Sequence, residues 1–445
     1  SNIAIAPTVA ALAEIKPKLY NIDPKSFFEF VINATFRNDH CIFPEVKKIM
    51  PGQVLSFNGK IQVKNYWKYN YEQCKLYEND IIKEFDRLMY NAISRLVNLS
   101  NKNVLFLSGG IDSRVILGYL MEIAYKKFSV CFYENIEENG SDFTIAKQIA
   151  QFYSLNSFEF FIDLQEFTKY AKPAVSMVDG RSEVIDSCPL SKLSYLLSEQ
   201  FKFFYNGDKS FGSHKSVSNI EDGLNEIGWF SLDQASRIAD WINPCLKNRI
   251  SKEIKHDLNI ITKKYIEEEP NAIKDKLYFQ ERLGNKQNAF THAKLPYMEQ
   301  ARPFLDEDVI DFVSCLPNYF RDGKYILKKL LKYRFPSLNM FHFSDKDSLP
   351  SSKTFINHLS RDPDMLLFLQ DQCLYKLDPR ITELLNMDTY KKACLSLLCG
   401  NNLPPVRRDW MMQVPGMWRF FNKSENRINP FFALLRIAQL NLYLS

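Results

Sequence analysis

Long hydrophobic runs are missing from this sequence of 445 residues. No apolar stretch approaches the ~18–20 residues that a membrane-spanning helix needs, which excludes a protein anchored by such a helix. The first residues, SNIAIAPTVAALAEIK, lack an initiator Met and the pattern of a signal peptide, and resemble the interior of a domain. We therefore expect a cytoplasmic protein, with Ser1 and Asn2 either a tag remnant or part of a longer precursor.

Paired cysteines are also missing. The nine cysteines are odd in number and scattered, and no CxxC pair occurs. This excludes a disulfide framework and a zinc site of the usual spacing. Cys394 and Cys399 are the closest pair, and we expect both to be buried thiols in a protein of a reducing compartment.

Blocks of basic residues are absent as well. The net charge of +5 is too dilute over 445 residues to indicate a nucleic-acid partner. Hydrophobic residues make up 46% and charged residues 24% of the chain. This composition is typical of a globular protein, and the length allows two or three domains.

What is present is an alternation of strand and helix patterns. Apolar runs at 103–107, 128–133, 157–162 and 201–205 predict strands, and helical patterns lie between them. Strands that alternate with helices form a mostly parallel sheet covered on both faces, so we predict a doubly wound α/β domain. In such a domain the ligand binds at the carboxyl ends of the strands.

Two other regions flank this alternation. An Asn-Gly turn between the runs 53–57 and 61–66 predicts a β-hairpin. Strand signals fade after the alternation, and helical ones dominate. We place the α/β core at about 80–215 and a helical part at 216–445.

The stretch VLFLSGGIDSR, residues 104–114, ends a buried strand in a glycine pair. Two glycines allow a tight turn that points successive N–H groups outward at the start of a helix, and such turns bind anions. Ser108 and Ser113 add hydroxyl donors. A plain turn with Asp112 as a solvated cap is the other interpretation, but SGGxDS after an apolar strand favours an anion site.

Asp112 has a role beside an anion only if a cation is present, because a carboxylate repels a bare phosphate. A Mg²⁺ ion between Asp112 and the phosphates would remove this repulsion. The Walker A pattern, GxxxxGK followed by Ser or Thr, is absent. A P-loop kinase or ATPase is therefore excluded.

SGGIDS at 108–113 resembles the pyrophosphate-binding loop of the N-type ATP pyrophosphatases, which cleave ATP between its α and β phosphates and adenylate a substrate. Further stretches resemble asparagine synthetase in the same order. YNGDKSFGS (205–213) is similar to GxGGDExFGG, EQARPFLD (299–306) to EARVPFLD, and GKYILKKLL (323–331) to GKYILREAF. Residues 50–67 resemble the linker that follows the glutaminase domain of this family.

The resemblance implies ATP and Mg²⁺ as cofactors and assigns several residues. It makes Asp208 a second magnesium ligand beside Asp112, and it places strand 128–133 against adenine. Glu299 and Lys346 correspond to catalytic residues, with Lys346 stabilising the charge that develops during adenylation. The implied ligands of ATP and pyrophosphate are Ser108, Gly109, Gly110, Asp112, Ser113 and Val130.

The sequence also departs from the family. The glutaminase nucleophile, a Cys directly after the initiator Met, is missing, so we expect no glutamine hydrolysis. Residues 1–78 are expected to be the remnant of a glutaminase-like domain and its linker, followed by a synthetase domain at 79–445. Lys209 replaces the Glu of GDE, and the RxKxxF motif around Lys346 has lost its Arg and its aromatic residue.

Tyr205 stands where asparagine synthetases commonly have Glu. β-Lactam synthetases have a Tyr there, paired with the residue equivalent to Glu299 as a dyad that deprotonates the attacking amine. Tyr205 also fits a second interpretation, as a core residue of the aromatic strand FKFFY. Residues 429–444 are similar to the tail of lasso-peptide cyclases, which close a ring.

The resemblance implies an ATP-dependent, AMP-forming amide ligase that joins a small-molecule or peptide carboxylate to ammonia or an amine. The ammonia or amine would come from solution, or from a glutaminase domain or partner that is absent from this chain. Alternatives are an intramolecular amide cyclase, a tRNA-modifying enzyme with Cys131 or Cys188 as nucleophile, and a non-catalytic binding subunit. The oligomeric state stays open, a homodimer included. His214 and His292 lie near the motifs and receive no role.

Overall fold

The computed structural model describes most of the chain. The described residues are 3–15, 21–69, 71, 74–125, 127–135, 141–162, 167–181, 183–209, 211–212, 215–266, 268–343, 359–399 and 428–445.

A five-stranded parallel sheet forms the α/β core. Its order is β5 (Ser157–Ile162), β4 (Phe128–Asn135), β3 (Asn103–Phe106), β6 (Phe203–Tyr205) and β7 (Glu299–Ala301), and every neighbouring pair is parallel. The chain runs outward from β3 to β5 and then returns to place β6 on the other side of β3. This reversal makes the sheet doubly wound, so the predicted fold class is confirmed.

The fifth strand is the one that the sequence analysis missed. β7 lies in the part predicted to be helical, and its three residues are too short for any periodicity to show.

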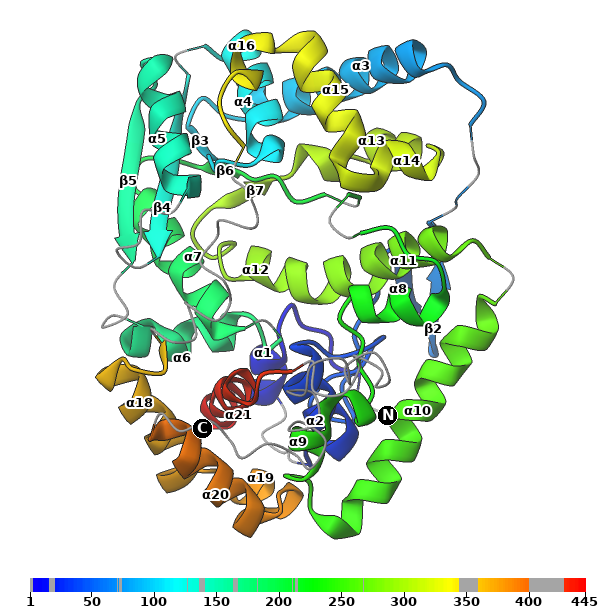
Figure 1. Ribbon diagram of the computed structural model, residues 1–445, viewed down its shortest axis with the longest axis vertical. Coiled ribbons are helices and arrows are strands. Elements are labelled where there is room, and N and C mark those ends of the chain that lie inside the picture. The colour runs from blue at the N-terminus through cyan, green and yellow to red at the C-terminus, as the bar shows by residue number, and fades with distance from the viewer. Residues whose placement is uncertain are drawn as a thin grey trace, which may run out of the picture.

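Helices cover both faces of the sheet. On one face, the helices α3 (Glu78–Val97), α4 (Ile111–Ile123), α5 (Ser141–Phe152) and α15 (Tyr325–Arg334) share a core with Leu105, Val130 and Tyr205. On the other face, α7 (Val184–Leu197) packs against Val104 and Phe204. Successive strand residues therefore point to opposite cores, as burial on both faces requires. Figure 1 shows this layered unit in the upper part of the molecule.

A long helical segment crosses the middle of the molecule below the sheet (Figure 1). It runs from α11 (Pro270–Leu277) through the π-helix η3 (Tyr278–Gln287) to α12 (Asn288–His292). A ten-residue π-helix is rare, and π-helical turns are frequent at functional sites.

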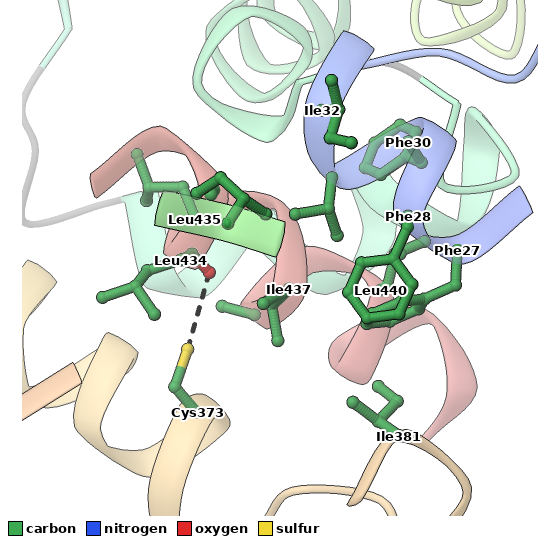
Figure 2. Close-up of a cluster of buried hydrophobic side chains, with 14 of the residues drawn as sticks. Phe27, Phe28, Phe30, Ile32, Cys373, Ile381, Leu434, Leu435, Ile437 and Leu440 are labelled. Atoms are coloured by element: carbon green, nitrogen blue, oxygen red, sulfur yellow. Dashed lines mark hydrogen bonds between the residues drawn. The ribbon is translucent and has the colours of Figure 1, made fainter. Parts of the chain in front are cut away.

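The lower part joins the two ends of the described chain. Helix α2 (Pro24–Asn33) begins at the N-cap Asp23 and buries Phe27, Phe28 and Phe30 against α21 (Pro430–Leu444). Figure 2 shows these rings beside Leu434, Ile437 and Leu440, with the Cys373 thiol donating to the Leu434 carbonyl oxygen at 3.5 Å. Val9 and residues from Ile22 to Val46 thus share one core with the C-terminal helices. That residues 1–78 are a glutaminase-domain remnant stays a prediction.

The hairpin prediction is confirmed by β1 (Gln53–Phe57) and β2 (Ile61–Asn65), which pair in antiparallel register. The remaining elements are short or helical. They are α1 (Val9–Ile15), α6 (Phe167–Met177), α8 (Ile220–Glu226), η2 (Asp233–Ala235), α9 (Ser236–Ala239), α10 (Pro244–Lys264), η4 (Pro303–Leu305), α13 (Glu307–Ser314), α14 (Asn318–Arg321), η5 (Asp322–Lys324), α16 (Pro336–Asn339), α18 (Pro363–Gln370), η6 (Asp371–Tyr375), α19 (Pro379–Leu384) and α20 (Met387–Leu398).

Two further observations bear on the sequence analysis. Across the described ranges, no helix combines the length and the apolar character that crossing a membrane requires. All nine cysteines are free thiols, and Cys394 is buried as expected. Cys399 is exposed, because it lies at the C-cap of α20, so the prediction of a buried thiol was wrong there.

Candidate active site

The reversal of strand order brings two loops together. β3 and β6 are hydrogen-bonded neighbours, with Leu105 opposite Tyr205. The SGGIDS loop follows β3, and Asn206, Gly207 and Asp208 follow β6. Both loops therefore leave the same edge of the sheet at the point where ligands of doubly wound folds bind.

The glycines of these loops allow close approach. A Cβ atom on Gly109 would lie 2.7 Å from Oδ1 of Asp142, in the first turn of α5. A Cβ atom on Gly207 would lie 2.9 Å from Cβ of Asp112. No larger residue fits at either position without a shift of the neighbouring atoms, and at Gly207 the second loop packs directly against the start of α4.

The loop's own hydroxyl groups hold its shape. The N–H group of Ser108 donates to Oγ of Ser113 at 3.1 Å, and the N–H group of Gly110 donates to Oγ of Ser108 at 3.2 Å. Gly110 is the N-cap of α4 and provides no side-chain cap. The first N–H groups of this helix therefore face the carboxyl edge of the sheet, as in an anion-binding turn.

Asp112 forms ion pairs with two lysines. Its Oδ2 atom accepts from Nζ of Lys209 at 2.7 Å and from Nζ of Lys324 at 2.8 Å. Burial by itself would raise the pKa of Asp112, but the two ammonium groups outweigh burial, and the pKa lies below its usual range. Asp112 is thus ionised and ion-paired.

Asp208 faces cations as well. Lys209, Lys294 and Arg302 all interact electrostatically with its carboxylate. Lys294 is only 4% exposed, and burial lowers its pKa despite the attraction of Asp208. Four basic side chains, those of Lys209, Lys324, Lys294 and Arg302, therefore lie near two carboxylates. Because basic groups outnumber these carboxylates, the cluster is suited to an anion.

The positive charge of Arg302 also acts on α12 in the central helical segment. Arg302 donates to Asn288 and Thr291 of α12, which are neutral groups. Burial and the charges of Arg181, Lys48 and Arg302 lower the pKa of His292 to about 4. His292 is therefore neutral near pH 7, and a proton there would add to a region that is already positive.

The predicted Mg²⁺ site was tested against these contacts. A divalent ion at Asp112 would meet both ammonium groups on the same carboxylate, and at about 4 Å and an effective dielectric of about 20 each would repel it by roughly 8 kcal/mol. Oδ1 of Asp112, by contrast, is buried and has no hydrogen-bond partner in the described structure, so the two lysines occupy only one oxygen of this carboxylate. Within the described ranges, no three His, Cys, Asp or Glu side chains form a group that could hold a metal. The residues do not fit a metal centre with Asp112 as a ligand.

Arg114, the last residue of VLFLSGGIDSR, ties the loop to a distant segment. Its side chain is fully buried and donates to the carbonyl oxygens of Gly109 and Phe341, both at 2.8 Å, and to that of His342. The guanidinium group also lies over the ring of Phe343, 4.4 Å from its centroid. Arg114 thus fixes the glycine loop against residues 338–343, which lead along the chain toward Lys346.

We expect Arg114→Lys to lower the free energy of unfolding by about 2–4 kcal/mol, because a lysine ammonium cannot satisfy all of these buried carbonyl groups. Urea unfolding of the variant and the parent protein measures this. Arg249→Lys, at a side chain 56% exposed, is the matched control and should change stability by less than about 0.5 kcal/mol. Equal losses in the two variants would contradict the assigned role of Arg114.

The predicted Tyr205–Glu299 pair is not formed. The register of β6 and β7 places Tyr205 opposite Ala301, whereas Glu299 lies opposite Phe203 at the amino end of β7 and is exposed. Tyr205 is fully buried in the core, its hydroxyl has no hydrogen-bond partner in the described structure, and burial raises its pKa. The second interpretation, a core residue, is the one that the structure supports.

Two other predicted residues lie away from the cluster. Val130 is the third residue of β4, and its N–H group donates to the Asn156 carbonyl oxygen, inside the sheet rather than at its carboxyl edge. Lys346 and His214 lie outside the described residues. The structure brings together Ser108, Gly109, Gly110, Asp112, Ser113 and Asp208.

The sequence analysis missed the cationic partners in this cluster. Lys209 was noted only as a departure, although its side chain contacts Asp112 directly. Lys324 lies in the GKYIL stretch that carried the resemblance, so a signal for it was present. Arg302 lies in the EQARPFLD stretch that carried the resemblance but received no role there, and Lys294 belongs to no such stretch. Only the fold brings them near Asp208.

The fold and the cluster define an α/β domain with a glycine turn and a group of basic side chains at the switch point of a doubly wound sheet. Residues 84–208, which include both loops as far as Asp208, match the family model described as asparagine synthase. This part of the chain is therefore similar to the asparagine synthase family.

Two individual proteins are also similar. Asparagine synthetase (glutamine-hydrolyzing) 1 of Bacillus subtilis strain 168 is 29% identical over 145 residues, which cover 32% of this chain and 22% of that protein. The match thus spans about a fifth of the length of this curated relative. The solved structure of U34-tRNA thiolase NcsA from Methanococcus maripaludis, with its 4Fe-4S cluster, aligns over 74% of this chain and 86% of that one. At 14% identity and a TM-score of 0.27, that alignment has no weight for function.

Proposed function

We propose that this chain is an ATP-dependent ligase that forms amide bonds through an acyl-adenylate. The observation that carries the proposal is the asparagine synthase match at 84–208, which coincides with the anion-binding turn and the cationic cluster. A carboxylate oxygen attacks the α phosphorus, the bond to the bridging oxygen of the β phosphate breaks, and pyrophosphate leaves. Ammonia or an amine then attacks the acyl carbon, loses a proton, and AMP leaves.

In this proposal the residues of the switch point bind the pyrophosphate part of ATP. The N–H groups at the start of α4 and the hydroxyl groups of Ser108 and Ser113 donate to phosphate oxygens. Lys209 and Lys324 stabilise the charge on pyrophosphate as it leaves. The resemblance implies Mg²⁺ together with ATP. Because Asp112 does not fit as a metal ligand, no step is assigned to the metal here.

The alternatives have less support. The cyclase hypothesis was based in part on the Tyr205–Glu299 pair, which is not formed, and in part on the likeness of residues 429–444 to lasso-peptide cyclases. The tRNA-modifying hypothesis needs a reactive thiol, but Cys131 and Cys188 are buried. Burial raises the pKa of the Cys188 thiol to about 12 and that of Cys131 well above its usual range, so both stay protonated near pH 7.

The test is pyrophosphate release in the presence of a panel of carboxylic acids, with ammonia supplied. We expect release that depends on both ATP and one class of acid, with AMP as the second product. Release of phosphate and ADP instead, or no acid-dependent release from any panel, would contradict the proposal and favour a non-catalytic subunit.

A variant of the loop adds a structural control. Gly109→Ala should reduce pyrophosphate release at least ~10-fold, because the new methyl group meets Asp142 and forces the anion-binding turn open. Gly223→Ala, where the nearest atom lies at 3.7 Å, should retain full release. Full activity in the Gly109 variant would place the phosphates elsewhere.

A further inference from the structure

Lys209 is a buried cation in contact with the carboxylate that the sequence assigned to a metal. Its side chain is 7% exposed, and Nζ lies 2.7 Å from Oδ2 of Asp112. The pKa of Lys209 is lowered, because burial outweighs the attraction of Asp112. The GDE motif of the resembling family has an acidic residue at this position. Compared with that motif, position 209 beside the turn carries a basic side chain instead of an acidic one.

A second lysine reaches the same oxygen from a distant part of the chain. Lys324 lies 212 positions after Asp112 and places Nζ 2.8 Å from Oδ2. Its backbone is in the left-handed region, with φ of 59°, which is uncommon for a residue other than glycine. A Cβ atom added to Gly212 would lie 3.3 Å from Cγ of Lys324. The backbone of Lys324 thus adopts an uncommon conformation next to Gly212.

The two ammonium groups and the start of α4 lie beside the same carboxylate. Lys294 and Arg302 add positive charge at Asp208, within the same cluster. Among the described residues, the carboxylates that interact with Lys209 are those of Asp112 and Asp208, and the basic side chains near them outnumber them. An anion of high charge density would balance this excess of basic groups.

We propose that Lys209 is a built-in counter-cation for pyrophosphate, so that this turn binds the phosphates of the nucleotide without a divalent metal on Asp112. Asp112 then serves to orient Lys209 and Lys324 rather than to hold magnesium. This inference rests on the proposed function, because it concerns the same phosphate site.

The experiment is calorimetric titration of the full chain with inorganic pyrophosphate, once in EDTA and once in excess Mg²⁺. For the parent protein we expect dissociation constants within about 3-fold of each other in the two buffers. Lys209→Glu, which restores an acidic residue, should weaken binding in EDTA at least ~100-fold and regain affinity when Mg²⁺ is added. Lys263→Glu makes the same charge change at an exposed position on α10 and should behave as the parent.

Lys209→Gln is a second variant, for the case that Lys209→Glu does not fold. It removes the positive charge of Lys209 without adding a negative charge at a buried site. It should weaken pyrophosphate binding about 10-fold or more in both buffers, with an unchanged circular dichroism spectrum. Binding by the parent that is ~100-fold weaker in EDTA than in Mg²⁺ overturns the inference and leaves the proposed function intact. Absence of pyrophosphate binding in both buffers overturns the proposed function together with it.

Discussion

Asp112→Asn is expected to reduce ATP–pyrophosphate exchange at least ~100-fold, comparable to the loss when one positioned donor to the developing charge is removed. The asparagine amide is neutral and presents one oxygen to two ammonium groups that contact the same atom in the parent. Lys209 and Lys324 then repel each other in a buried site without a shared counter-charge. We expect them to separate, so that the phosphates lose two positioned donors.

The measurement is incorporation of labelled pyrophosphate into ATP in the presence of the acid found by the panel. Asp233→Asn is the matched control, because its side chain is 67% exposed and pairs with Lys255 at the surface. Exchange in the control should equal that of the parent. Unchanged exchange in Asp112→Asn would refute the assignment of the phosphate site to this loop.

Much of the α/β core could be predicted from the sequence because its signals are local. β3 and β4 are short apolar runs bounded by polar or glycine residues, and the glycine pair marks the turn between β3 and α4. β7 could not be predicted, since three residues carry no period and its pairing with β6 depends on the fold. Local sequence signals therefore predicted the strands that are followed directly by a helix. They missed β7, which pairs with a strand that is distant in the sequence.

The candidate site was predictable only in part. The motif indicated Asp112 and Asp208, but not that Lys209 and Lys324 would bind Asp112 across 97 and 212 positions of sequence. Tyr205 shows the same limit on a smaller scale. The aromatic run predicted a strand, but which of its residues faces which core depends on pairing with β3 and β7.

The second large effect concerns Glu183, which joins distant parts of the lower core. Its carboxylate accepts from Nζ of Lys286 on η3 at 2.5 Å and from Nη2 of Arg436 on α21 at 2.9 Å. Arg436 also donates to the carbonyl oxygens of Val31 and Ile32 at the end of α2, both at 2.9 Å. A side chain that is 13% exposed thus links α7, η3 and α21, and through Arg436 also α2.

We expect Glu183→Gln to lower the free energy of unfolding by about 3–5 kcal/mol at pH 7, because it leaves two buried cations without a counter-charge. Urea unfolding measures this. Glu253→Gln on α10, at a side chain 46% exposed, should change stability by less than about 0.5 kcal/mol. Similar transition midpoints for the two variants would contradict the structural role of Glu183.

The same carboxylate predicts a dependence of stability on pH. Burial alone would raise the pKa of Glu183, but Arg436 and Lys286 lower it to about 2, from 4.5 in the unfolded chain. Its stabilisation of about 3 kcal/mol is therefore complete above pH 4.5 and is lost as the pH falls toward 2, where the folded protein also takes up the proton. The parent should lose stability across this range faster than Glu183→Gln, so that their unfolding free energies converge at low pH. A constant difference between the two proteins from pH 5 to pH 2.5 would show that the carboxylate charge is not what holds these helices together.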